Sequence, residues 1–185
     1  MAPPVVGILA LQGDFEAHAK LVTELGAQAR EVRVAAELED LDALIMPGGE
    51  STTMSLGIER EQLAGPLREL IGSGLPVLGT CAGMIVLDRD HLGLLDIRAE
   101  RNAFGRQLRS FETELAVDGL AGGPLHAVFI RAPWVAEHGD GVQLLALLDD
   151  HPVAVRAGNI VAVAFHPELG GDTRLHALAL GLNGA

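Results

Sequence analysis

The most informative segment of the sequence runs from Leu75 to Leu87 and reads LPVLGTCAGMIVL. A short apolar segment ends at Gly79, a cysteine stands between small residues, and a second apolar segment follows Gly83. This pattern predicts a buried strand, a sharp turn and the start of a helix. The Gly-x-Cys-x-Gly spacing matches the nucleophile elbow of hydrolases, with sulfur in place of oxygen. We therefore expect Cys81 to project from the turn at a helix N-terminus, which favours its thiolate form.

A structural role for the same cysteine is the simpler alternative. Cys81 is the only cysteine in the chain, and a lone cysteine is most often a small buried core residue. The flanking glycines favour the catalytic interpretation, because an ordinary core strand gains nothing from them. Further support for a catalytic role of Cys81 has to come from residues much later in the sequence.

The bulk composition predicts a globular protein with one domain spanning residues 1–185. Hydrophobic residues make up 49% of the chain and charged residues 21%, which excludes a disordered chain. A formal net charge of −12 argues against binding to a nucleic acid backbone. One cysteine rules out an internal disulfide and suits a reducing compartment. No apolar run approaches the roughly 18 residues that a membrane span needs, so we expect a cytoplasmic protein without membrane contact.

Apolar segments alternate between strand and helix periodicity in the first half of the chain. This order predicts an α/β fold with an open, mainly parallel sheet flanked by helices. Short strand-like segments dominate after residue 92, and they predict antiparallel strands added to that sheet. Helices are expected at residues 15–25, 59–71, directly after Cys81, and 172–182. Strands are expected at residues 5–11, 29–34, 41–46, 75–79, 94–100, 110–117, 127–131, 142–148, 153–156 and 160–165.

The third strand ends in the sequence PGGESTT at residues 47–53. Ligands of such sheets bind beyond the carboxyl ends of the strands, so this loop and the Cys81 turn are expected to share one crevice. Two successive glycines leave the backbone free to present N–H groups to an anion. The simpler alternative is an ordinary turn into a helix, with Ser51 or Thr52 as the N-cap.

The last predicted strand delivers His166, Pro167 and Glu168 at its carboxyl end. In extended backbone, His166 and Glu168 point to the same side. A histidine oriented by a carboxylate and facing a cysteine is the arrangement that a thiol nucleophile needs. Taken alone, His-Pro-Glu would more often be a capped turn. Its combination with the Cys81 elbow and the Pro-Gly-Gly loop favours a catalytic site.

The remaining histidines show no metal-ligand spacing, and we predict no metal site. We interpret them as structural or surface residues; they are His18, His91, His126, His138, His151 and His176.

Taken together, the elbow and the His-Pro-Glu segment resemble the triad of class I glutamine amidotransferases, which have a flavodoxin-like fold. More narrowly, nearly the whole chain is similar to the glutaminase subunits of pyridoxal 5′-phosphate synthases. The elbow and His-Pro-Glu are common to many amidotransferases. The narrower resemblance is carried by residues 9–13, 47–54, 100–107, 128–133 and 165–169.

The resemblance implies a role for each matching residue. Cys81 would be the nucleophile, His166 the general base and Glu168 the residue that orients it. Backbone N–H groups of Gly49 and Ala82 would form the oxyanion hole. Bound L-glutamine would contact a set of loop residues, which are Gly49, Glu50, Ser51, Arg101, Ile130 and Arg131. An arginine suits the carboxylate of a free amino acid, although a surface or ion-pairing role is the alternative for Arg101 and Arg131.

The resemblance also implies a partner. Ammonia would pass to a separate pyridoxal 5′-phosphate synthase subunit in a hetero-oligomer, and the glutaminase itself would need no cofactor. Two alternatives stay open: a glutaminase of another synthase, such as imidazole glycerol phosphate synthase, and a docking subunit with an idle triad. One departure from the family pattern is visible, since the segment Asp88-Arg89-Asp90 is shorter than expected.

Overall fold

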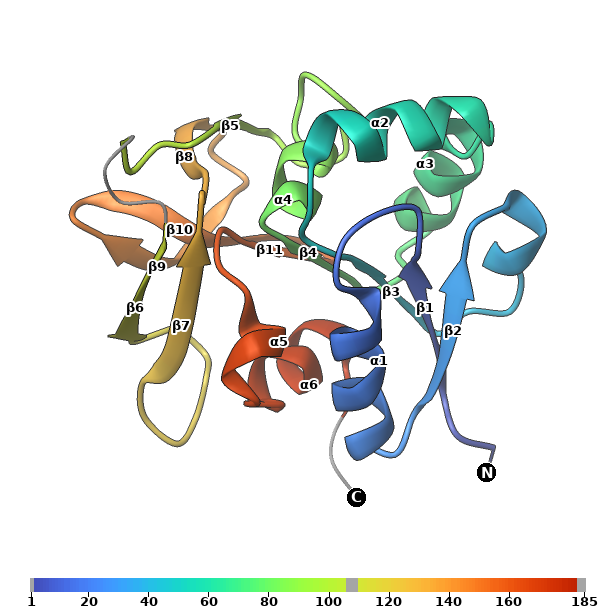
Figure 1. Ribbon diagram of the computed structural model, residues 1–185, viewed down its shortest axis with the longest axis horizontal. Helices are drawn as coiled ribbons and strands as arrows, with labels where there is room; N and C mark the ends of the chain where they lie inside the picture. Colours follow the sequence, from blue (N-terminus) through green and yellow to red (C-terminus); the bar gives the residue numbers. More distant parts are fainter. Residues whose placement is uncertain (1, 106–109, 183–185) are drawn as a thin grey trace.

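A seven-stranded sheet forms the centre of the computed structural model, which describes residues 2–105 and 110–182 (Figure 1). Its strand order is β2-β1-β3-β4-β11-β10-β9. The first five strands in that order run parallel to one another; they are β2 (Gln28–Val32), β1 (Val5–Leu9), β3 (Ala43–Met46), β4 (Val77–Thr80) and β11 (Ile160–Val163). The predicted open, mainly parallel sheet is therefore confirmed.

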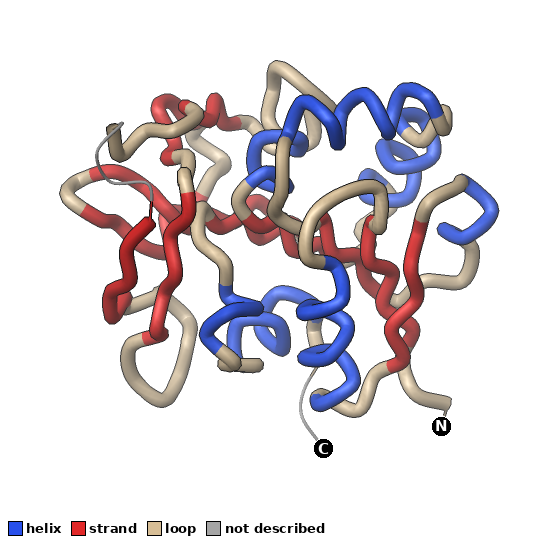
Figure 2. Tube along the Cα trace, in the orientation of Figure 1, coloured by secondary structure: helices blue, strands red, loops and turns tan. Residues whose placement is uncertain are grey.

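The central strands are apolar because helices cover both faces of the sheet (Figures 1 and 2). Every residue of β3, β4 and β11 is buried, as expected for strands packed on two sides. One face carries α2 (Ser51–Arg60), α3 (Ala64–Gly72) and α4 (Ala82–Leu87). The other face carries α1 (Phe15–Glu24), α5 (Pro167–Gly170) and α6 (Arg174–Leu180). A short 3-10 helix, η1 (Ala35–Leu38), follows β2.

Antiparallel strands extend the sheet beyond β11, as the second half of the sequence predicts. β10 (His151–Ala157) pairs antiparallel with β11, and β9 (Gln143–Leu148) pairs antiparallel with β10. The strands predicted at 94–100, 110–117 and 127–131 do not join this sheet; they belong to two separate antiparallel pairs, which lie next to this edge in Figure 1. They join β5 (Ile97–Glu100) to β8 (Trp134–His138) and β6 (Ser110–Leu115) to β7 (Leu125–Ile130).

The structure corrects the predicted helix at residues 59–71. Two helices occupy the region, and the first of them begins at Ser51, well before the predicted start. The break falls at Gln62, whose backbone has a φ of 54°, in the left-handed region that ends a helix. Leu63 then starts the second helix as its N-cap. Apolar periodicity continues across this break because both helices face the same core.

Several strand limits also differ from the predictions. β1 ends at Leu9 and β11 at Val163, two residues before the expected ends, although Phe165 remains fully buried. The strand expected at 94–100 begins only at Ile97. β8 was not predicted, because its exposed residues give no alternating pattern. None of the helices within residues 2–105 and 110–182 has the length and apolar character of a membrane span.

Replacement of Gly83 tests how tightly α4 packs on the sheet. A Cβ at Gly83 would collide with the carbonyl oxygen of Met46 in β3, so the backbone of α4 or that of β3 must move. We expect Gly83→Ala to lower the free energy of unfolding by about 1–3 kcal/mol, or roughly 2–4 °C in Tm per kcal/mol. Gly65→Ala is the matched control, because a Cβ at Gly65 of α3 meets nothing within 4 Å. Thermal unfolding should show that control unchanged or more stable by up to about 1 kcal/mol. Equal effects of the two substitutions would contradict this packing.

Candidate active site

Cys81 lies at the turn between β4 and α4. Its backbone has a φ of 48° and a ψ of −103°, a conformation that L-residues rarely adopt and that stores about 1–3 kcal/mol of strain. The Cys81 N–H donates to the Val163 carbonyl oxygen at 2.8 Å, which ties the turn to β11. A Cβ at Gly79 would lie 2.6 Å from the Leu87 side chain, so the close approach of α4 to β4 requires glycine. These contacts form the sharp strand-to-helix turn that the sequence predicts.

His166 follows β11 after two buried residues and caps the N-terminus of α5. Its Nδ1–H donates to Oε1 of Glu168 at 2.7 Å, and the Glu168 side chain is only 1% exposed. The predicted extended backbone is wrong here, because Pro167 and Glu168 already belong to the first turn of α5. Proline is well suited to a helix start, and the tight turn brings the carboxylate back to the ring.

The electrostatics of His166 favour its protonated form. Burial by itself lowers the pKa of the imidazole, but interactions with Cys81 and Glu168 outweigh burial and raise the pKa to about 10. The Cys81 thiol also faces the Ile130 carbonyl oxygen, with the Sγ atom 3.9 Å away. A protonated imidazole beside a sulfur atom is suited to donating a proton to a leaving group.

A cavity of about 250 Å³ brings the predicted site residues together. It collects segments that follow β3, β4, β5, β7 and β11, as expected for loops at the carboxyl ends of strands. Ile85 and Asn102 also line it, although sequence reasoning did not select them. Ile85 lies one helical turn after Cys81, and that spacing could have identified it. The predicted residues that line the cavity are Gly49, Glu50, Ser51, Cys81, Ala82, Arg101, Ile130, Arg131 and His166.

Glu168 does not line this cavity, since it lies behind His166. The structure thus places the carboxylate where it can act only through the imidazole. Arg106 and Gln107, which belong to one of the motifs that carry the resemblance, lie outside the described residues.

Glu50 is the N-cap of α2, and not Ser51 or Thr52, which the alternative interpretation of this loop had as the cap. Its carboxylate accepts hydrogen bonds from the backbone N–H groups of Thr52 at 3.1 Å and Thr53 at 2.8 Å. Those bonds lower the pKa of Glu50 to about 2. The Glu50 N–H itself donates to Oε1 of Gln12 at 2.5 Å, so the loop after β1 holds the loop after β3. The side chain of Glu50 is therefore engaged in shaping the cavity wall.

Arg101 is held at the cavity by neighbouring polar side chains. Its guanidinium donates to Oγ1 of Thr52 at 3.1 Å and lies 3.4 Å from Nε2 of His91. The other ring nitrogen of His91 contacts the buried carboxylate of Asp88 at 2.7 Å. Asp88 also accepts from the backbone N–H of Ala99 at 3.2 Å. The segment that looks short in sequence thus supports Arg101 through a connected set of hydrogen bonds.

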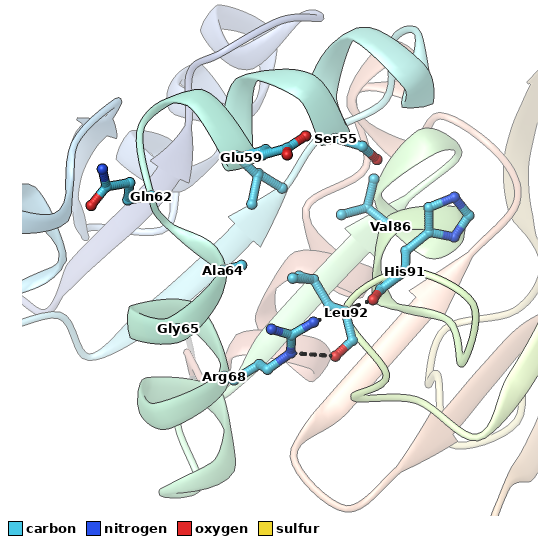
Figure 3. Close-up of a pocket in the computed structure, with 10 residues that line it drawn as sticks. Ser55, Glu59, Gln62, Ala64, Gly65, Arg68, Val86, His91 and Leu92 are labelled. Atoms are coloured by element: carbon cyan, nitrogen blue, oxygen red, sulfur yellow. Dashed lines mark hydrogen bonds between the residues drawn. The ribbon is translucent and has the colours of Figure 1, made fainter.

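A second cavity, of about 400 Å³, opens between α2, α3 and the segment before β5 (Figure 3). Figure 3 shows Arg68 on its wall, where Nε donates to the Leu92 carbonyl oxygen at 2.8 Å. Its surface is mainly apolar, and the described residues that line it include no thiol to accompany His91, the histidine that is paired with Asp88. The smaller cavity at Cys81 is therefore the better candidate for chemistry, although it is not the larger of the two.

Metal binding has no support within residues 2–105 and 110–182. These residues contain no group of three or more His, Cys, Asp or Glu side chains arranged to hold a metal ion. The Cys81 cavity offers a thiol, an imidazole and two guanidinium groups, together with the polar side chains of Glu50, Ser51 and Asn102.

Comparisons with known proteins identify the class first. A solved structure described as a glutamine amidotransferase is 47% identical, superposes with a TM-score of 0.91, and aligns over 97% of this chain and 99% of its own. A solved structure described as a putative GMP synthase protein from Thermoplasma acidophilum aligns over 98% of this chain and 94% of its own. Its identity is 19% and its TM-score 0.73, so it shares the fold. These likenesses confirm the predicted fold class.

The chain belongs to the SNO glutamine amidotransferase family, whose model matches residues 8–181. A relative from Frankia alni, named pyridoxal 5′-phosphate synthase subunit PdxT, is 54% identical over 96% of this chain and 94% of its own length. A relative of the same name from Rhodococcus opacus is 47% identical over 96% of each chain. The resemblance found in the sequence motifs is thereby confirmed.

The raised pKa of His166 predicts a pH dependence of stability. Because the folded pKa of about 10 exceeds the ordinary value of 6.5, the imidazolium stabilises the folded protein. This contribution is complete below pH 6.5 and is lost as the pH rises toward 10. We expect the stability difference between wild type and His166→Gln to shrink over that interval. Urea unfolding at a series of pH values measures it, and a difference that stays constant would contradict the raised pKa.

Proposed function

We propose that this chain hydrolyses L-glutamine to L-glutamate and ammonia, with Cys81, His166 and Glu168 as its catalytic triad. The observation that carries the proposal is the cavity in which a strained cysteine, a carboxylate-bound histidine and two arginines meet. Family membership supports the same reaction. One domain over residues 1–185 carries all of these groups.

The substrate is a small amino acid with a carboxylate and an ammonium group. Arg101 and Arg131 supply positive charge at the cavity, which suits the α-carboxylate of glutamine. Gly49, Glu50, Ser51 and Ile130 line the remaining wall. The backbone of Gly49, Ser51 and Ile130 offers N–H and carbonyl groups to the polar ends of the substrate, whereas the backbone N–H and carbonyl of Glu50 are bonded to Gln12 and Met54. This arrangement favours binding with the side-chain amide of glutamine toward Cys81.

The first half of the reaction forms a covalent thioester. His166, as the general base, already holds the proton of the thiol, and the thiolate attacks the amide carbon, so that an S–C bond forms and negative charge moves to the amide oxygen. N–H groups of Gly49 and Ala82 stabilise that oxyanion. Ala82 is the first residue of α4, where backbone N–H groups have no carbonyl acceptor one turn earlier. His166 then donates its proton to the nitrogen, the C–N bond breaks and ammonia leaves.

The second half of the reaction releases glutamate. His166, now neutral, takes a proton from water, and the hydroxide attacks the thioester carbon. The C–S bond breaks and the sulfur leaves as the thiolate beside the imidazolium. Throughout both halves, Glu168 keeps Nδ1 of His166 protonated, so that Nε2 is the nitrogen that exchanges protons.

The ammonia acceptor is a pyridoxal 5′-phosphate synthase subunit that forms a hetero-oligomer with this chain. Relatives of about 50% identity carry that subunit name, which favours it over the synthase of imidazole glycerol phosphate. A reactive thiol with no disulfide partner suits the cytoplasm, where we place the complex. The glutaminase chemistry uses only side chains and backbone of this chain and requires no cofactor.

Glutamate release with and without the synthase subunit tests reaction and partner together. We expect hydrolysis by wild type to rise when a pyridoxal 5′-phosphate synthase subunit is added, and Cys81→Ala to lose at least about 10³-fold in rate. An imidazole glycerol phosphate synthase subunit is the matched control partner and should give no increase. Stimulation by that control alone would contradict the partner. Unchanged glutamine-dependent synthesis with Cys81→Ala would show that the triad is idle.

A further inference from the structure

Two buried histidines lie behind Glu168 and have no part in the proposed reaction. His18 on α1 and His176 on α6 are both 0% exposed, and Nδ1 of His18 lies 2.8 Å from Nε2 of His176. Burial, followed by the charges of His176 and His166, holds the pKa of His18 well below its ordinary value. Burial lowers the pKa of His176 to about 4, against an opposing effect of Asp172. Both rings are therefore neutral near pH 7.

His18 approaches the oxygen of Glu168 that His166 does not use. Nε2 of His18 lies 3.4 Å from Oε2 of Glu168, while Oε1 accepts the hydrogen bond from His166 at 2.7 Å. Oε2 is buried and receives no well-formed hydrogen bond from the described residues. A buried carboxylate oxygen without a donor is costly, and the ring nitrogen of His18 is placed to supply one. Thr80 Oγ1 lies 3.4 Å from the same nitrogen and helps to fix its position.

The pairing of the two rings selects one set of tautomers. If Nε2 of His18 carries the proton, it faces Glu168 as a donor, and Nδ1 accepts from Nε2–H of His176. Nδ1 of His176 is then a bare acceptor, and this buried atom has no hydrogen-bond partner among the described residues. The opposite tautomers would set a lone pair of His18 against the carboxylate and leave a buried N–H of His176 unpaired. The first set avoids both penalties.

We propose that His18, with its tautomer fixed by His176, is a positioning residue that holds the carboxylate of Glu168 on the His166 ring. Hydrogen bonds then lead from α6 through α1 to α5 and the imidazole. Their effect is to keep Oε1 on Nδ1 while Nε2 of His166 exchanges protons with Cys81 and the leaving nitrogen. The inference deepens the glutaminase proposal and rests on it for its kinetic part, although the contact with Glu168 stands on the geometry alone.

The polar groups around His18 and His176 come from α5, from β4 and from the segments that precede α5 and α6. α5 contributes Glu168, His166 caps that helix, and Thr80 comes from β4. Asp172, before α6, is paired with Arg174 at 2.6 Å and affects His176 through its charge. Asp172 already forms an ion pair with Arg174. Glu168 is therefore the carboxylate whose second oxygen depends on His18 for a hydrogen-bond donor.

Substitutions at His18 separate positioning from folding. His18→Leu fills the space without a donor, and His18→Gln keeps an N–H group near the position of Nε2. We expect NMR titration to give a lower pKa for His166 in His18→Leu, and a pKa near the wild-type value in His18→Gln. With the synthase subunit present, kcat of His18→Leu should fall by about 10- to 100-fold with KM little changed, and the basic limb of its pH profile should move to lower pH. His18→Gln should recover most of kcat.

His126→Leu is the matched control, because His126 is exposed and its ring pairs with Glu112 and Glu114 at the surface. It should leave the His166 titration and kcat at wild-type values. An unchanged His166 titration in a folded His18→Leu protein would overturn the inference. Equal loss in His18→Gln and His18→Leu, in step with a lower Tm, would also overturn it in favour of a packing role. Absence of glutamine hydrolysis by wild type would contradict the proposed function, and the titration would still decide the role of His18.

Discussion

The backbone at Cys81 is the constraint on which the rest of the site depends. A φ of 48° lets β4 turn into α4 within one residue, and this conformation persists only because the surroundings hold it. The hydrogen bond to Val163 and the close packing at Gly79 and Gly83 supply that hold. Fully buried α4 is consequently fixed against the sheet, and the thiol projects at a defined point beyond the strand ends. Strain at the nucleophile is offset by packing throughout the core.

The parallel sheet then brings the other groups to the thiol. Loops after β3, β4 and β11 emerge at the same edge, which places Gly49, Cys81 and His166 around one cavity. The separate β6–β7 pair provides the opposite wall with Ile130 and Arg131 at the end of β7. Helices on the far face bring His18 and His176 behind Glu168. Each layer of the fold therefore contributes one part of the site.

Much of this arrangement could be predicted from the sequence, because the spacing of apolar residues and glycines along the chain indicates strands, helices and turns. The apolar runs of β1, β3, β4 and β11 and the glycines around Cys81 indicate the sheet and its elbow. The glutamine-contacting residues come from a family resemblance and stay predictions as to their roles. The break at Gln62 could not be predicted, because a left-handed residue other than glycine leaves no compositional sign.

The contacts behind Glu168 depend on long-range packing, which one sequence does not reveal. His18 and His176 are 158 residues apart, and the sequence alone indicates no more than structural or surface roles for them. The sequence does contain an indication that His18 is buried. It is three residues after Phe15 and four before Val22, on the apolar face of its helix. A histidine on such a face is buried, but only the fold shows that it meets a carboxylate. The helical turn at Pro167 also could not be predicted, because the apolar strand before it indicates extended backbone through Glu168.

The measurement that tests the role of Cys81 most directly is the position of covalent labelling by a glutamine analogue. The complex with the synthase subunit would be treated with the electrophile 6-diazo-5-oxo-L-norleucine and mapped by peptide mass spectrometry. We predict one adduct, on Cys81, that free glutamine competes away and that His166→Gln slows. Glutamine hydrolysis by a complex that carries its label on another residue, or that remains unlabelled at Cys81, would contradict this prediction.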